Sequence, residues 1–200
     1  MRNHFPNCFA IILLVSAASV FSADAPLEFP AADGSLKKPL EAVGAGGSKG
    51  AVFIFYLHDC PICNVYAPEI ERIRSAYESK GFAFYIVQTD PALKAEAGRK
   101  HAEEYGFKCA VLMDGANRLA AKFRATVTPE VAVVSANEKL LYLGRIDDLY
   151  ADYGKRRPEP TVRDLRAALD AIVDGKPVSP AAGPAIGCFI PSQKTNAAQK

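Results

Sequence analysis

Apolar runs and helical periodicities alternate along the chain from residue 51 onward. Three runs have the length of a strand, and they span 51–57, 82–88 and 109–113. The run 82–88 is continuously apolar and aromatic, which predicts a strand covered on both faces. Helical patterns follow the runs, one of them stopping at a glycine; they span 63–81, 92–105 and 116–124. This alternation predicts an α/β fold.

The second half of this region continues with a hairpin and a last helix. Residues 131–135 and 140–143 form two short apolar runs joined by four polar or small residues, which predicts a β-hairpin. Thr161 and Asp164 have the spacing of a capping box before a helix that stops at Gly175. The charged stretch between hairpin and helix, 145–160, is expected to be a solvated connection.

One domain accounts for most of the chain. Residues 23–178 are expected to form an α/β sandwich, a central mixed sheet with helices on both faces. The domain begins with a segment rich in Pro and Gly, which includes a short edge strand near 36–43. Residues 179–200 are rich in Pro, Ala and Gly and end in a polar run, so we expect a partly disordered tail.

The first 22 residues have the composition of a secretory signal peptide. Arg2 precedes an uncharged apolar stretch at 9–20, which is too short to span a bilayer as a helix. Small residues follow, and we place cleavage after Ser22, with Ala25 as a second possibility. Cys8 would be removed with this segment. The sequence therefore predicts an exported protein, in a bacterium a periplasmic one.

Charge and length narrow the possible functions. Removal of residues 1–22 takes one basic side chain, Arg2, from the 24 in the chain, which leaves 23 basic against 22 acidic residues and a net charge of +1. This near-neutrality argues against nucleic acid or a polybasic membrane contact. No second apolar stretch of membrane length follows, so we expect no membrane span after cleavage. A domain of this size can bury a core without disulfides, so its four cysteines indicate chemistry.

The strongest chemical signal is the pair Cys60 and Cys63, with Pro61 between them. The pair directly follows an apolar strand run and directly precedes a helical pattern. At such a junction unpaired N–H groups and the positive end of the helix dipole favour a thiolate on the first cysteine. Pro61 suits the first helical position, which places Cys60 at the cap and Cys63 one turn inside. We expect a redox dithiol in which Cys60 attacks and Cys63 resolves.

Other uses of this motif fit less well. Covalent haem attachment requires a histidine directly after the second cysteine, and Asn64 stands there. A zinc site would normally bring a second metal-binding pair. Copper(I) stays open, because His58, Cys60 and Cys63 could bind a soft ion in a metal-delivery module. A purely structural bridge would close too short a loop to stabilise the fold much.

These features resemble the thioredoxin-like superfamily, and residues 36–190 resemble its redoxin or peroxiredoxin-like (AhpC/TSA-type) branch. The resemblance rests on the strand followed by Cys60-Pro61-Ile62-Cys63, on Pro68 within the helix, and on Val127-Thr128-Pro129 before a strand. It implies a thioredoxin-like sandwich, a cis Pro129 facing the two cysteines, and a Thr128 backbone that binds an incoming peptide strand. The extra helix and strand at 92–113 match the insertion of the redoxin branch.

Three departures from the family pattern bear on the chemistry. Phe53 and Leu57 replace the Pro and Thr that peroxiredoxins place before the attacking cysteine, which weighs against peroxidase activity. Ile54 replaces the buried Asp of thioredoxins, so another group must accept the proton of Cys63. We expect His58 to do so, because it is close in sequence and titrates near neutral pH. The negative charge of Asp59 should oppose a thiolate at Cys60.

Two further cysteines have different expected roles. Cys109 begins an apolar strand and is expected to be a small core residue. Cys188 lies in the tail, where it could fold back as an additional redox thiol, form a bridge with Cys109, or stay free.

The predicted function is therefore that of an exported thiol–disulfide oxidoreductase that cycles Cys60 and Cys63 between dithiol and disulfide. Its expected partners are protein or small-molecule thiols and disulfides and an upstream redox partner. Neither a cofactor nor a metal is expected. A thiol peroxidase with an antioxidant role and a copper-binding module are the alternatives.

Overall fold

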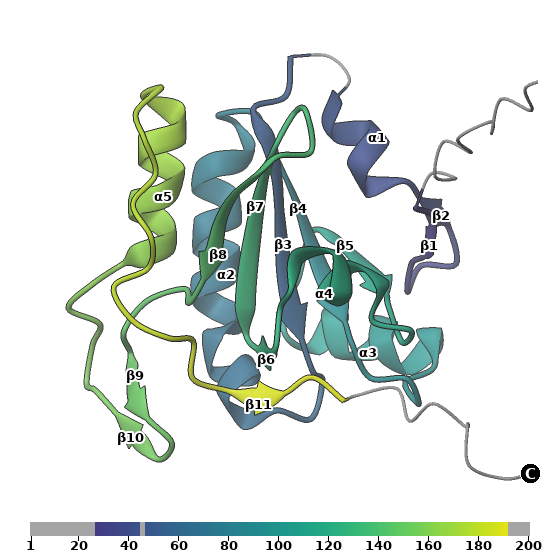
Figure 1. The fold of residues 1–200 in the computed structure, drawn as a ribbon. Coiled ribbons are helices and arrows are strands. Elements are labelled where there is room, and N and C mark those ends of the chain that lie inside the picture. Colours follow the sequence, from purple (N-terminus) through teal and green to yellow (C-terminus); the bar gives the residue numbers. More distant parts are fainter. Residues whose placement is uncertain (1–26, 45–46, 192–200) are drawn as a thin grey trace, which may run out of the picture.

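The computed structural model describes residues 27–44 and 47–191. Its core is a sheet of five strands in the order β5-β4-β3-β7-β8 (Figure 1). The strands are β3 (Gly50–Tyr56), β4 (Phe82–Gln88), β5 (Ala110–Met113), β7 (Glu130–Ser135) and β8 (Leu140–Gly144). The first three are parallel, whereas β7 runs antiparallel to β3, and β8 to β7. This confirms the predicted mixed sheet and the hairpin between its last two strands.

Helices cover both faces of this sheet. One face carries α2 (Pro61–Glu78), α3 (Ala95–Glu104) and α5 (Asp164–Val173), and the other carries α1 (Pro39–Gly44) and α4 (Arg118–Phe123). Strand β3 shows why its sequence is apolar throughout. Val52, Ile54 and Tyr56 belong to the first buried cluster, and their neighbours Ala51, Phe53 and Phe55 to the second. A strand buried on both faces has no position left for a polar side chain.

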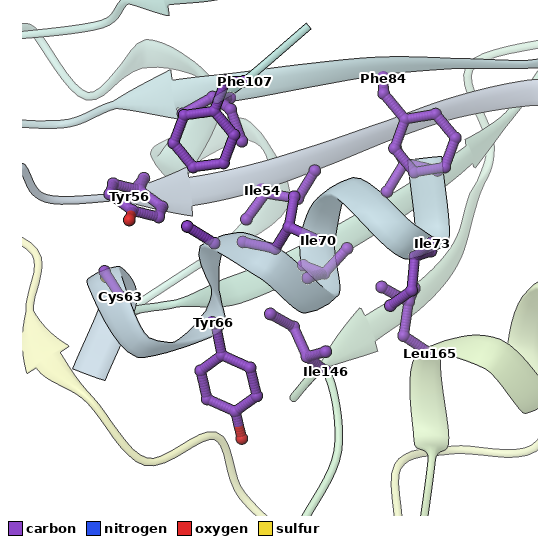
Figure 2. Packing of buried hydrophobic residues seen from close by; sticks show 14 of the residues in the cluster. Ile54, Tyr56, Cys63, Tyr66, Ile70, Ile73, Phe84, Phe107, Ile146 and Leu165 are labelled. Carbon is purple, nitrogen blue, oxygen red and sulfur yellow. The ribbon is translucent and has the colours of Figure 1, made fainter. Parts of the chain in front are cut away.

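The helix that carries the cysteines is held by a dense apolar contact. Ile70 and Ile73 of α2 lie between Ile54 of the sheet and Leu165 of α5 (Figure 2). All four side chains are almost completely buried. Because this packing immobilises the middle of α2, its N-terminus is held at the end of β3 (Figure 1).

Two predictions for the periphery are wrong. The expected edge strand near 36–43 is limited to β2 (Leu36–Lys37), which pairs with β1 (Phe29–Pro30), and Pro39 begins helix α1 instead. Proline suits the first helical turn, where its missing N–H costs nothing. The expected solvated loop 145–160 is buried at 146–149, and only its later part, with β9 (Tyr150–Asp152) and β10 (Lys155–Arg156), is exposed.

The predicted capping box at Thr161 and Asp164 is also absent. Arg163 is the N-cap of α5, without a side-chain capping bond. The Thr161 hydroxyl instead donates to Asp148 at 2.6 Å, and the Asp164 carboxylate accepts from Arg145 at 2.7 Å. Both side chains therefore tie the helix to the segment after β8, rather than cap it.

Two short strands complete the fold near the cysteines. Strand β6 (Val127–Thr128) pairs antiparallel with β11 (Cys188–Phe189), which comes from the expected tail (Figure 1). The predicted signal peptide at 1–22 and the end of the tail at 192–200 lie outside the described residues. Among the helices that the structure describes, none has both the length and the apolar character for a membrane span.

A matched pair of leucine substitutions tests this account of the core. Leu169 of α5 is 0% exposed and Leu36 of β2 is 70% exposed. We expect Leu169→Ala to lower the free energy of unfolding by about 2–5 kcal/mol, because it leaves a cavity. Leu36→Ala should change it by less than about 0.5 kcal/mol. Urea unfolding of the reduced proteins measures both, and equal effects would contradict the assignment of the core.

Candidate active site

The two motif cysteines occupy the junction between β3 and α2. Cys60 is the N-cap of the helix, with an extended backbone at φ −79° and ψ 113°, and Pro61 begins the helix as predicted. The Cys60 carbonyl accepts the first-turn bond from Asn64 N at 3.1 Å. Cys63 lies within the first turn. Cys60 is 1% exposed and Cys63 0%, and both are free thiols.

The loop before β7 meets Cys60 from across the sheet. The Thr128–Pro129 peptide bond is cis, as the family resemblance implies. The Cys60 sulfur lies 3.6 Å from the Thr128 carbonyl oxygen, and the thiol donates a weak hydrogen bond to it when protonated. Thr128 is completely buried. The structure thus brings together Cys60, Cys63 and Thr128-Pro129, which are far apart in sequence.

The surroundings of the two thiols separate their pKa values. A hydrogen bond from the Cys63 thiol lowers the pKa of Cys60 to about 5; burial opposes this effect, and a hydrogen bond from Cys188 adds to it. Burial raises the pKa of Cys63 well above its ordinary value, and the adjoining Cys60 sulfur raises it further. At neutral pH the geometry therefore favours a thiolate at Cys60 and a thiol at Cys63, the pattern of an attacking and a resolving cysteine.

The C-terminal segment supplies a third thiol to this site. Cys188 pairs with Thr128 in the β6–β11 ladder, and its side chain packs against the buried cluster that contains Cys60. Burial and the neighbouring Cys60 raise the pKa of Cys188 to about 12. The charge of Asp59 contributes to the raised pKa of Cys188, and its expected effect on Cys60 stays a prediction.

A family model described as Redoxin matches residues 28–155. The chain belongs to the Redoxin family. The sheet order, the helix that carries the cysteines and the cis proline together confirm the predicted thioredoxin-like fold.

Solved structures share the fold of this redoxin. A hypothetical protein from Sinorhizobium meliloti 1021 matches with a TM-score of 0.73 at 25% identity, over 85% of this chain and 92% of that one. An uncharacterized conserved protein from Geobacillus kaustophilus gives 0.72 at 28% identity, over 86% and 90%. A secreted Mycobacterium tuberculosis disulfide oxidoreductase homologous to E. coli DsbE shares the fold, with a TM-score of 0.51 at 17% identity, over 75% and 96%. A search of curated proteins gives no significant match.

A polar network lies behind the dithiol of this redoxin domain. His58 Nδ1 is 3.5 Å from Asp90 Oδ2, close enough for an ion pair, and the His58 ring packs edge-on against His101. Asn64 Nδ2 donates to the His58 carbonyl, and Asn64 Oδ1 accepts from His101 Nε2 and from Tyr56 at 2.9 Å. The contacts of the His58 ring are thus with Asp90 and His101. Its role as the proton acceptor for Cys63 stays a prediction.

Sequence reasoning missed three members of this network, Tyr56, Asn64 and His101. Burial lowers the pKa of His101, as does the neighbouring His58, and burial raises that of Tyr56. The position of Asn64 directly after Cys63 was a usable signal, since a polar residue in a buried first turn needs a partner. His101 sits on a separate helix, and no local pattern connects it with the motif.

Cys109 is separate from the other thiols. It lies beside Glu71 and Arg74 of α2, and burial raises its pKa to about 12. This redoxin structure does not bring it to Cys188, which packs on β6 and Cys60. Within residues 27–44 and 47–191, no group of three or more His, Cys, Asp or Glu side chains is arranged to hold a metal ion. The side chains of the alternative copper site, His58, Cys60 and Cys63, do not form such a group.

The origin of the low Cys60 pKa is testable. Cys63→Ala removes the largest stabilising hydrogen bond to the thiolate, so the pKa of Cys60 should rise from about 5 toward the roughly 8.5 of an ordinary thiol. Thiolate absorbance measured against pH in the reduced proteins reports this change. Cys109→Ala is the control and should leave the low transition in place. An unchanged transition in the Cys63→Ala protein would contradict the assigned cause.

Proposed function

We propose that this redoxin is a thiol–disulfide oxidoreductase that uses Cys60 as nucleophile and Cys63 as resolving thiol. The observation that carries the proposal is the placement of two buried thiols at the start of α2, beside the cis Thr128–Pro129 bond. Cys60 has a lowered pKa at the helix N-cap, and Cys63 has a raised pKa one turn inside. Two titratable groups with separated pKa values are a common mark of a catalytic pair.

The proposed exchange has two steps. The Cys60 thiolate attacks a substrate disulfide, forms a mixed disulfide and releases one substrate thiolate. Loss of the negative charge on Cys60 then removes one of the interactions that keep Cys63 protonated. Cys63 gives up its proton and attacks Cys60, which releases the second substrate thiol and leaves a Cys60–Cys63 disulfide. The reverse sequence oxidises a substrate dithiol.

Thr128 and Pro129 are proposed to form the substrate edge. Thr128 touches Cys60 through its carbonyl oxygen, and its backbone pairs with an extended strand in the structure, β11. An extended substrate segment that paired in the same way would bring its cysteine to Cys60. The proposed partners are therefore polypeptides or small thiols and disulfides, together with an upstream redox partner.

The place of action is proposed from residues 1–22 alone. Their apolar stretch fits a secretory signal peptide, and export would place the dithiol in an oxidising compartment such as the bacterial periplasm.

The site gives less support to a peroxidase. Leu57 and Phe53 stand where peroxiredoxins have a Thr and a Pro, and both are buried apolar side chains. The hydroxyl that would orient a peroxide is missing from position 57, so we place disulfide exchange first.

Trapping tests the roles of the two cysteines. Cys63→Ser combined with Cys188→Ser should accumulate mixed disulfides through Cys60 when the protein is incubated with a disulfide-bonded model protein, because neither neighbouring thiol is left to resolve them. Cys60→Ser should lose exchange entirely, and Cys109→Ser should exchange at the wild-type rate. Non-reducing electrophoresis with mass spectrometry identifies the adducts. Retained exchange in Cys60→Ser would refute the assignment.

A separate substitution tests the proposed proton acceptor. His58→Ala should slow reaction with a model disulfide by roughly tenfold to a hundredfold, the low end of what a positioned acid–base group contributes. The loss should vary with pH, because only a neutral imidazole can accept the proton. Rate constants measured from pH 5 to 8 decide the question. A rate equal to that of the wild type across this range would show that His58 is not the acceptor.

A further inference from the structure

Residues 187–190 occupy the edge of the active-site loop as an added strand. Cys188 pairs with Thr128 and Phe189 with Val127 in antiparallel register. The Thr128 hydroxyl donates to the Cys188 carbonyl at 3.2 Å, and Ile190 N donates to the Thr126 carbonyl at 3.1 Å. This is the geometry of β-strand addition, in which an extended segment completes an exposed edge.

The segment is built into this position at both ends. Upstream, Ala182 N donates to Asp164 Oδ1 at 2.7 Å, and downstream Asn117 Nδ2 donates to the Pro191 carbonyl at 2.6 Å. Between these points the Tyr153 hydroxyl donates to the Gly187 carbonyl. A Cβ atom on Gly187 would overlap the Thr128 carbonyl oxygen, so glycine permits the close approach.

This strand brings a thiol to the reactive sulfur. Cys188 lies opposite Thr128, whose carbonyl oxygen contacts the Cys60 sulfur, and the Cys188 side chain packs against the buried cluster that contains Cys60. Cys60 is only 1% exposed, whereas Phe189, the residue after Cys188, is 76% exposed. The Cys60 thiol is therefore shielded from solvent, whereas the apolar side chain of Phe189 faces solvent.

We propose that residues 187–190 are a tethered substrate strand, and that Cys188 is a third redox thiol which forms a disulfide with Cys60. This inference rests on the proposed function of Cys60 as nucleophile. It also defines a substrate class: extended polypeptide segments that add to the Thr128 edge, with a cysteine opposite Thr128 and a small residue before it. Such a segment must displace the tethered strand.

The internal step is a disulfide isomerisation with no net oxidation. In the protein with a Cys60–Cys63 disulfide, the Cys188 thiolate attacks the Cys60 sulfur. A Cys60–Cys188 bond forms, the Cys60–Cys63 bond breaks, and Cys63 leaves as a thiolate that takes up the proton given up by Cys188. Once Cys60 is in a disulfide it carries no charge, so one of the interactions that raise the pKa of Cys188 is gone.

Disulfide mapping of the full chain tests the third thiol. Reduced Cys63→Ser protein is treated with oxidised glutathione; Cys60 first takes up one glutathione, and Cys188 then displaces it. We expect a Cys60–Cys188 disulfide in most molecules, identified by mass spectrometry of the non-reduced digest. Cys63→Ser combined with Cys109→Ser is the matched control and should give the same bond. Persistent glutathionylated Cys60 with a free Cys188 would overturn the proposal.

The covering role is tested at Gly187. Gly187→Val should release the strand and speed alkylation of Cys60 by iodoacetamide by roughly tenfold, because the rate scales with the fraction of molecules whose edge is open. Pro184→Ala, at an exposed position of the same segment, should alkylate at the wild-type rate. Cys188→Ser keeps the backbone pairing of the strand, so Cys60 in this variant should be alkylated as slowly as in Pro184→Ala. Equal alkylation in Gly187→Val and wild type, with both folded by circular dichroism, would refute the cover.

The outcomes separate this proposal from the proposed function. Exchange with an external disulfide that needs Cys60, without a Cys60–Cys188 bond, would overturn only the third-thiol proposal. A Cys60–Cys188 bond in a protein that exchanges with no external disulfide would overturn the proposed function and leave the internal bond established.

Discussion

The antiparallel pairing of β3 with β7 is the constraint on which the active site depends. This ladder runs from Gly50 opposite Ser135 to Phe55 opposite Glu130. The chain therefore leaves β3 at the same end of the sheet where it enters β7. Cys60 and Thr128 meet there although 68 residues separate them. Helix α2 cannot move away from this edge, because its middle is packed between the sheet and α5 (Figure 2).

The chemistry of the dithiol follows from burial balanced against hydrogen bonds. Both motif cysteines are almost fully buried, and burial alone would keep both protonated. The Cys63 thiol, held one helical turn inside, donates to the Cys60 sulfur and stabilises its thiolate. This shared hydrogen bond lowers the pKa of Cys60 and raises that of Cys63. Once Cys60 is in a disulfide, its contribution to the raised pKa of Cys63 is lost.

The strand at residues 188–189 links this chemistry to regulation of access. The Thr128 edge carries backbone groups that need partners, and a segment of the same chain supplies them at a high effective concentration. A covered thiolate is less accessible to oxidants that would carry it to irreversible sulfinic or sulfonic states. The site would therefore select substrates that pair strongly with the Thr128 edge, because these can displace the tethered strand, and not simply any accessible disulfide.

The sequence alone determined the local parts of this protein. Unbroken apolar runs predicted the buried strands, and a proline after Cys60 and a glycine at position 81 marked the limits of α2, because these signals act within a few residues. The cis proline came from the resemblance to a family.

Tertiary structure decided the rest. Thr161 has the spacing of a helix cap, yet Asp148, 13 residues earlier, takes its hydroxyl. The Cys188 strand likewise contacts a loop 60 residues away. Such contacts depend on which groups the folded sheet brings together, and a local pattern of residue types carries no information about distant partners.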